Sequence, residues 1–330
     1  MFIPSNAYKF FDVKAHSLRG KKFFEGILNY RKKLLPLHEY RIQKPKDFKC
    51  VLCGHTHGQL LLEWEADYKM YQCDNCSAVS PNISPEKEKE HIDNVYATNL
   101  YMDKLEREIH AQYDYRKETF GKERLDYCVK RLGLALDQIN LLDVGCGAGY
   151  FLSYLTDHGV KCRGLEVTQG LAQYCQKRGL NVEASDLADE PDKEYDVIVM
   201  FDVLEHVYNP VELLKLAKSK LKDGGYLILY TPNIHSIGFE LMGAQQNVLL
   251  PFEHVCFYDE KSFNRLADES GFKVHTLETY GFDIMDYLLM KEYEDGYEYT
   301  EKLHEMMRWV QAVLDKQGVS NHFRLTLKNE

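Results

Sequence analysis

From residue 140 onward, short apolar runs alternate with segments in which apolar residues recur every three or four positions. We interpret the runs as strands and the segments between them as helices. The runs lie at about 140–145, 162–167, 181–184, 195–200 and 225–231. Strands that alternate with helices form a parallel sheet, because each helix carries the chain back across the sheet. The pattern therefore predicts an α/β domain.

Two more strands are expected near the end of the chain, at 272–278 and 322–328, with a helix at 259–270 before the first. Residues 283–320 between them show helical apolar spacing and are interpreted as one or two amphipathic helices. The apolar positions are Leu303, Met306, Met307, Val310, Val313 and Leu314. Such a face needs a partner, which could be the same domain, a second subunit in a homodimer, or a substrate that the insertion covers.

Composition divides the chain into four parts. Residues 1–49 hold twelve Lys/Arg against four Asp/Glu, although the whole chain has a net charge of -10. This basic N-terminal arm could bind RNA, an anionic membrane surface or a phosphorylated substrate, or dock on the acidic body. It contains a helix that is expected to end at Pro36. A zinc ribbon at 50–80, a helical linker or cap at 81–136 and the α/β domain at 137–330 follow.

The apolar content of 45% predicts a large core and excludes wholesale disorder. No apolar stretch approaches the roughly 20 residues that cross a bilayer, so no membrane span is expected. The N-terminus lacks the charged start and apolar middle of a signal peptide. Nine cysteines without such a signal are typical of reduced thiols, and we expect a cytoplasmic protein.

Four of the cysteines form two CxxC pairs, with nineteen residues between the pairs. They are Cys50, Cys53, Cys73 and Cys76. Two such pairs can place four thiolates around one tetrahedral Zn²⁺, and the segment between them is expected to form strands. A site with four thiolates has no open position, so this zinc is predicted to be structural. Ser77 stands where a glycine often follows the last cysteine.

The most informative stretch lies where the first strand of the α/β domain meets a helix. It contains Asp143, Gly145, Gly147 and Gly149 in the pattern D-x-G-x-G-x-G, and Tyr150 stands where a dinucleotide fingerprint needs a third glycine. The pattern resembles the first motif of class I S-adenosylmethionine (AdoMet) dependent methyltransferases. The resemblance implies a seven-stranded, Rossmann-like sheet with an antiparallel seventh strand, and a cofactor at the glycine turn.

Further along the chain, the resemblance assigns more cofactor contacts. Glu166, at the end of the second strand, matches the acid that binds the ribose hydroxyls. Asp186 matches the acid near the adenine, with Leu187 beside the ring. The segment FDVLEHV at 201–207 resembles small-molecule and ubiquinone-biosynthesis O-methyltransferases, and it would place Phe201 and Val203 at the methionine end.

Three residues are predicted to lie near the point of methyl transfer. Glu205 and His206 belong to FDVLEHV, and His254 precedes an aromatic segment and a helix, as in related enzymes. His254 is the preferred general base and His206 the second candidate, because the usual pKa of histidine suits that role. A third possibility is that no general base acts and that the enzyme only positions the acceptor and the cofactor. The ubiquinone relatives also suggest a divalent cation at Asp202, Glu205 and His206.

The sequence thus predicts an enzyme that methylates a small molecule or sugar, most simply at a hydroxyl oxygen. A second hypothesis is methylation of tRNA or rRNA, with the zinc ribbon and basic arm binding phosphates. Against it, the catalytic half is acidic and no Asn-Pro-Pro-Tyr-like motif follows the fourth strand. A third hypothesis is a scaffold that binds AdoMet without catalysis.

Overall fold

The computed structural model describes residues 13–44, 47–64, 67–84 and 112–330. The centre of the α/β domain is a sheet of seven strands. They are β4 (Asn140–Val144), β5 (Lys161–Leu165), β6 (Val182–Glu183), β7 (Tyr195–Phe201), β8 (Leu221–Pro232), β9 (Lys273–Tyr280) and β10 (His322–Lys328). They form one sheet in the order β6-β5-β4-β7-β8-β10-β9. Only β10 runs antiparallel to its neighbours, β8 and β9. The predicted sheet, including its reversed last strand, is confirmed.

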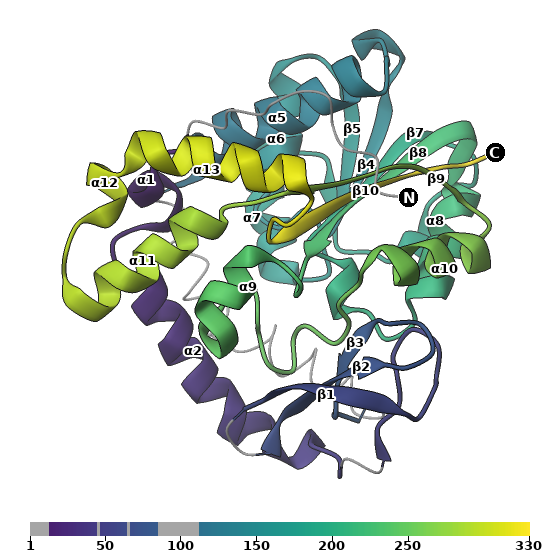
Figure 1. Cartoon of the computed structure of the whole chain (residues 1–330). Helices are drawn as coiled ribbons and strands as arrows, with labels where there is room; N and C mark the ends of the chain where they lie inside the picture. The colour runs from purple at the N-terminus through teal and green to yellow at the C-terminus, as the bar shows by residue number, and fades with distance from the viewer. Residues whose placement is uncertain (1–12, 45–46, 65–66, 85–111) are drawn as a thin grey trace.

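Helices cover both faces of this sheet (Figure 1). The connections contain α6 (Tyr150–Asp157), α7 (Gln169–Lys177), α8 (Pro210–Lys220), α9 (Ile237–Met242) and α10 (Glu260–Ser270). They also contain short turns of 3₁₀ helix at Leu136–Gln138, Leu187–Asp189, Leu204–His206 and Gly243–Gln245. Successive strand residues alternate between the faces: Leu142 packs with α8 and α10, whereas Leu141 packs with α6. The continuous apolar runs arise because both faces are buried.

The face that α6 covers is completed by residues 112–131, which are helical throughout. Within this stretch α5 (Lys122–Asp126) lies between two π-helical turns, Lys117–Gly121 and Tyr127–Arg131. A π turn widens the helix, and here Gly121 leaves room for Tyr154 of α6, because a Cβ at Gly121 would lie 2.4 Å from that of Tyr154. Residues 85–111, about half of the predicted cap at 81–136, lie outside the described residues.

The N-terminal region is built from α1 (Ala15–Arg19), α2 (Phe23–His38) and a 3₁₀ turn at Glu39–Arg41. The helix α2 continues past Pro36, where the sequence predicts its end, because buried Leu34 and Leu35 hold the last turn against the body. Two of the basic residues of this region, Arg31 and Arg41, are buried. They bind groups of the body and do not face solvent.

Residues 283–320 form three helices, α11 (Asp283–Asp295), α12 (Tyr299–Lys302) and α13 (His304–Gln317), where the sequence predicts one or two. Figure 1 shows them beside α1 and α2 at one end of the sheet. Met285, Leu289 and Met307 pack on Leu18 of α1. Of the predicted amphipathic face, Leu303 and Met307 thus pack within the same chain, whereas Met306 and Val313 are exposed. Homodimerisation through this insertion stays a prediction.

The cysteine-bearing segment forms its own antiparallel sheet of β1 (Gly58–Glu63), β2 (Lys69–Cys73) and β3 (Val79–Pro81). Figure 1 shows this ribbon beneath α10. Its interior is continuous with the main core, since Cys50, Cys73 and Tyr71 belong to the same apolar cluster as Phe263 and Leu266 of α10. The ribbon and the α/β domain thus share one core.

In the described part of the chain, no helix combines the length and apolar character needed to cross a membrane.

Candidate active site

The three glycines of the D-x-G-x-G-x-G stretch all adopt positive φ, at 72°, 54° and 75° for Gly145, Gly147 and Gly149. Residues with a Cβ rarely adopt this backbone conformation. At Gly145 the segment that follows β7 adds a second constraint, because a Cβ would lie 2.6 Å from Cγ2 of Val203. The turn therefore needs glycine both for its shape and for the close approach of Val203.

Glu166 lies against this turn, although it follows a different strand. One carboxylate oxygen accepts the N–H of Gly147 at 2.8 Å, and the other accepts the N–H of Thr168 at 2.8 Å. Its side chain is buried. Each oxygen keeps a lone pair for another donor, so two adjacent ligand hydroxyls can bind the carboxylate.

The two predicted adenine contacts lie after β6. Asp186 is exposed, and its Oδ1 accepts the N–H of Ala188 at 2.8 Å, which begins a 3₁₀ turn. Leu187 beside it is 4% exposed and packs in the main core. The side chain of Asp186 thus faces solvent, whereas that of Leu187 is buried.

Asp143 precedes the glycine turn and is 3% exposed. Burial raises its pKa, Arg124 opposes this, and Glu166 adds a smaller rise, so that the pKa of Asp143 is about 7. The guanidinium carbon of Arg124 lies 3.9 Å from the ring centre of Phe201, which the resemblance places at the methionine end. Arg124 is a site residue that the sequence did not indicate, since it belongs to a helix with no motif.

Tyr113 also reaches the turn. Its hydroxyl donates to the carbonyl of Gly149 at 3.4 Å, and its ring lies 5.1 Å from that of Tyr150. The guanidinium carbon of Arg178 lies over the ring of Tyr113, 3.8 Å from its centre. The start of the helical stretch 112–131 therefore contacts the glycine turn through Tyr113.

The FDVLEHV segment leaves the carboxyl end of β7, next to the glycine turn. Asp202 adopts φ 58°, which is unusual for a residue with a side chain. Glu205 is fully buried, and its Oε2 accepts the hydroxyl hydrogen of Thr231 at 3.0 Å. Burial, with Asp202 nearby, raises the pKa of Glu205 well above its ordinary value. Among the described residues its Oε1 has no hydrogen-bond partner.

The structure brings Glu205, His206 and His254 together, with one potential metal-ligating atom of each within 4.8 Å of the others. The two histidine rings meet edge to face at 4.6 Å. Nδ1 of His206 donates to the carbonyl oxygen of Glu253 at 2.9 Å, which leaves Nε2 as an acceptor. Burial lowers the pKa of His206, so the ring is neutral near pH 7.

Asp202 does not join this cluster, although the sequence placed it with Glu205 and His206 as a possible ligand. Its Oδ1 instead lies 3.6 Å from Nε2 of His322, at the start of β10. After Arg124, His322 is the second residue of the candidate site that the sequence did not indicate.

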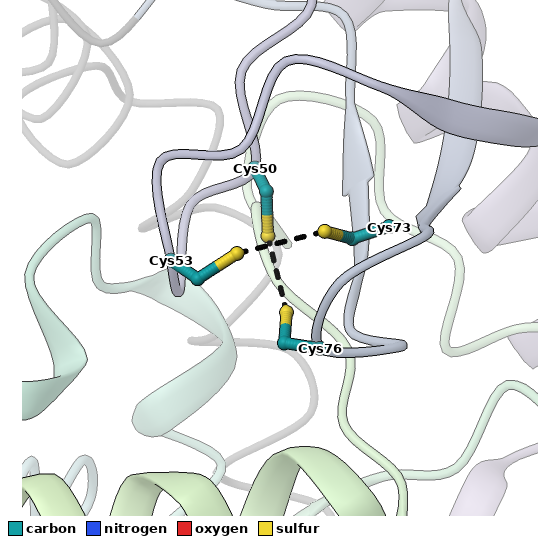
Figure 2. A group of neighbouring side chains, drawn as sticks. All are labelled: Cys50, Cys53, Cys73 and Cys76. Atoms are coloured by element: carbon teal, nitrogen blue, oxygen red, sulfur yellow. Dashed lines mark hydrogen bonds between the residues drawn. The ribbon is translucent and has the colours of Figure 1, made fainter.

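The four cysteines of the ribbon point toward one centre (Figure 2). The sulfur atoms of Cys50 and Cys76 are 3.5 Å apart, as are those of Cys53 and Cys73. All four lie within 4.8 Å of one another. Four sulfurs at about 2.3 Å from a zinc ion would be about 3.8 Å apart. The geometry fits that ion, and the hydrogen bond from Cys76 already lowers the pKa of Cys50 to about 5.

The two cysteine loops have the same backbone shape. Gly54, after Cys53, adopts φ 70°, and Ser77, after Cys76, adopts φ 64°. The N–H groups of Gly54 and Ser77 donate to the carbonyl oxygens of Cys50 and Cys73 at 2.8 and 2.9 Å. Ser77 is held in this conformation by a hydrogen bond from its hydroxyl to Asp259, the N-cap of α10, at 2.7 Å.

The ribbon is joined to the loop that carries His254. Val79 and Phe257 exchange two backbone hydrogen bonds, at 2.9 and 2.8 Å. On the same loop, the N–H groups of Val255 and Cys256 donate to the carbonyl of Glu205 at 2.7 and 3.2 Å. A short chain of backbone bonds therefore connects the cysteine site to the cluster of Glu205, His206 and His254.

The strand order, the reversed last strand and the glycine turn at β4 define the class I methyltransferase fold. A family model described as a methyltransferase domain matches residues 110–277, just over half of the 330 residues. The chain belongs to this family.

Among curated relatives, the ubiquinone biosynthesis O-methyltransferase of Alkalilimnicola ehrlichii is 29% identical over 133 residues, covering 37% of this chain and 53% of that protein. The enzyme of the same name from Chromobacterium violaceum is 24% identical over 204 residues, covering 56% of this chain and 87% of that protein. The chain thus spans about half the length of the first relative. A solved structure of a SAM-dependent methyltransferase from Archaeoglobus fulgidus aligns with a TM-score of 0.44 and 21% identity, covering 62% of this chain and 93% of that one.

Proposed function

We propose that this protein transfers the methyl group of AdoMet to a hydroxyl oxygen of a small molecule or sugar. The observation that carries the proposal is the meeting of Glu166 with the glycine turn, where a buried carboxylate accepts the N–H of Gly147 among three glycines of positive φ. The family membership and the likeness to O-methyltransferases support it.

Different residues around the turn would bind different parts of the cofactor. Glu166 would bind the ribose hydroxyls, and Asp186 and Leu187 would hold the adenine. Phe201, Val203 and the glycines would line the methionine end, where the guanidinium of Arg124 can bind the carboxylate and Asp143 the amino group. AdoMet, when bound, supplies a methyl group on a positively charged sulfur.

The chain's own contribution is to position the acceptor, exclude water and accept a proton. Tyr113, at the start of the helical stretch 112–131, lies against the turn and would help to exclude water from the cofactor. A histidine at the carboxyl edge of the sheet can take the proton that a hydroxyl loses when its ring is neutral, as that of His206 is near pH 7. His254 and His206 are the candidates that the sequence names.

The cluster of Glu205, His206 and His254 has a second candidate role, as a site for a divalent cation. The observation that favours it is the buried Oε1 of Glu205, which has no hydrogen-bond partner among the described residues. Loss of activity on chelation, with restoration by Mg²⁺ or Mn²⁺ alone, would support this role. Activity that persists in a strong chelator, with the ribbon zinc retained, would exclude it.

We further propose that Cys50, Cys53, Cys73 and Cys76 hold one structural Zn²⁺. Binding of zinc to such sites contributes on the order of 10 kcal/mol to folding. We expect one zinc per chain by elemental analysis and none in a Cys76→Ser variant. The exposed residue His57 supplies the control, since His57→Ala should keep the metal.

Calorimetry of AdoMet binding tests the cofactor assignment. Glu166→Ala should weaken binding by tenfold or more, because hydrogen bonds to a charged group contribute about 1.5–3 kcal/mol each. Glu212→Ala, on an exposed position of α8, is the matched control and should bind normally. Equal affinity of the two variants would refute the assignment.

RNA as the acceptor is tested separately, because the exposed lysines of the N-terminal region remain available to phosphates. Fluorescence anisotropy with tRNA at low salt should show no binding. Tight, salt-sensitive binding would favour the RNA hypothesis.

A further inference from the structure

A third histidine lies at the carboxyl edge of the sheet, apart from His206 and His254. His322 begins β10, and its Nε2 lies 3.6 Å from Oδ1 of Asp202. Asp202 immediately precedes Val203, which packs against Gly145 of the glycine turn. The pair of Asp202 and His322 therefore lies beside the proposed cofactor site.

The neighbouring amide of Asn321 determines which nitrogen of His322 carries a hydrogen. Oδ1 of Asn321 accepts the N–H of Phe282 at 3.2 Å, and Nδ2 donates to Asp286 at 3.3 Å, so the orientation of the amide is set. The same Oδ1 lies 3.0 Å from Nδ1 of His322. Because Oδ1 can only accept, Nδ1 must be the donor, and Nε2 of the neutral ring keeps its lone pair.

Three charged groups surround the ring: Asp202 on the loop after β7, Arg19 of α1 and Asp286 of α11. Burial lowers the pKa of His322 below its ordinary value, Asp202 and Asp286 raise it, and Arg19 lowers it. The net effect keeps the ring neutral near pH 7. Two hydrogen-bond acceptors, Nε2 and the carboxylate, then face each other 3.6 Å apart, and a donor placed beside them can bind either one.

The pair is also open to a ligand. The side chain of Asp202 is 55% exposed and that of His322 is 19% exposed. Asp202 is held at φ 58°, and residues kept in such unfavourable conformations gather at functional sites. Its N–H donates to the carbonyl of Tyr230 at 3.0 Å, which fixes the strained residue to β8.

We propose that His322 binds the acceptor hydroxyl and takes its proton, and that Asp202 stabilises the imidazolium that forms. This inference rests on the proposed methyl transfer and names the base for it. The hydroxyl donates its hydrogen to Nε2. As the oxygen–methyl bond forms and the carbon–sulfur bond of the cofactor breaks, the electron pair of that bond stays on sulfur and the hydroxyl proton moves to Nε2. The resulting imidazolium forms an ion pair with Asp202, and Asn321 holds its Nδ1–H.

His322→Gln and Asp202→Asn test the assignment, with His275→Gln as the matched control. His275 lies on β9 toward the opposite end of the sheet and packs on Tyr226. Each variant is first checked for AdoMet affinity by calorimetry, which should stay unchanged. Methyl transfer is then measured with labelled AdoMet and the small-molecule fraction of a cell extract, resolved by mass spectrometry.

His322→Gln should lower the transfer rate by a hundredfold or more, the usual contribution of a general base. The rate of the wild-type protein should rise with pH through a midpoint below 6.5, because the neutral ring is the base, and this rise should vanish in His322→Gln. Asp202→Asn should also lose rate, since an amide N–H would occupy Nε2. His275→Gln should keep the rate and the pH profile.

The inference is overturned if His322→Gln keeps its rate and pH profile, or if His254→Gln alone removes the pH dependence. A second readout needs no acceptor: ¹⁵N NMR of histidine-labelled protein should show Nδ1 protonated and Nε2 bare in His322 at pH 7. A protonated Nε2 would contradict the pair. Failure of the proposed function can be distinguished from failure of this inference. If the proposed function is wrong, the wild-type protein itself would bind no AdoMet or transfer no label.

Discussion

At the scale of single residues, the site depends on side chains and glycines that the chain brings together from distant positions. The residues that follow strands β4, β5 and β7 could be identified from the sequence, because each directly ends a recognisable apolar run. Arg124 and His322 could not. Arg124 lies in a helix without a motif, and His322 meets Asp202 only because β10 runs antiparallel into the sheet.

Gly145→Ala should abolish AdoMet binding, and Gly159→Ala should not. Both glycines adopt φ 72°, so each change should cost about 1–2 kcal/mol of stability. Only at Gly145 would the new methyl group also meet Val203, whereas a Cβ at Gly159 meets nothing within 4 Å. Urea unfolding and calorimetry separate the two effects. Equal AdoMet affinity of the two variants would show that the turn does not bind the cofactor.

Asp143→Asn should reduce the dependence of stability on pH. The pKa of Asp143 is about 7 in the folded protein and 3.8 ordinarily, so between these values the folded state holds a proton that the unfolded state has lost. Stability contributed by this proton is therefore lost as pH rises from about 4 to about 7. Urea unfolding at several pH values should show a shallower fall in the variant. An unchanged slope would contradict this assignment of the buried proton.

At the scale of elements, the ribbon that carries the four cysteines pairs with the loop before α10. Its β3 strand pairs with Phe257, and the adjacent N–H groups bind the carbonyl of Glu205. The two CxxC pairs predict the metal site from spacing alone. This pairing could not be predicted, because it joins residues separated by more than 170 positions and depends on where the ribbon docks.

Removal of zinc should loosen that loop while leaving the glycine turn intact. In hydrogen–deuterium exchange, chelation should speed exchange of the Val255, Cys256 and Phe257 amides, because β3 loses its anchor. Amides of β4 and α6 should keep their protection. Uniform loss of protection across both regions, or no change in either, would contradict a local support role.

At the scale of the whole molecule, the described portions of the N-terminal region, the ribbon and the α/β domain are packed together. The ribbon shares the core of the α/β domain, α11 packs on α2, and α2 holds the loop before α10 through a hydrogen bond from Tyr30 to Glu253. Charge composition indicated a basic arm, but it could not show that Arg31 binds the carbonyls of Gln245 and Gln246. Burial of such groups depends on the tertiary fold.

This packing predicts a single unfolding transition for the zinc-loaded protein. Differential scanning calorimetry should give one peak, with coincident loss of ribbon and sheet signals, because a shared core couples the two units. Two separated transitions, with zinc release in the first, would show that the ribbon folds on its own.

The central claim, methyl transfer to oxygen, is tested most directly by AdoMet that carries ¹³C in its methyl group. After incubation with the protein and the small-molecule fraction of a cell extract, the ¹³C chemical shift of the labelled product identifies the atom that received the methyl. We predict a methyl group on oxygen, formed by the wild-type protein and lost in Glu166→Ala. AdoMet that stays bound and unreacted, or a label on nitrogen or carbon, would contradict the account.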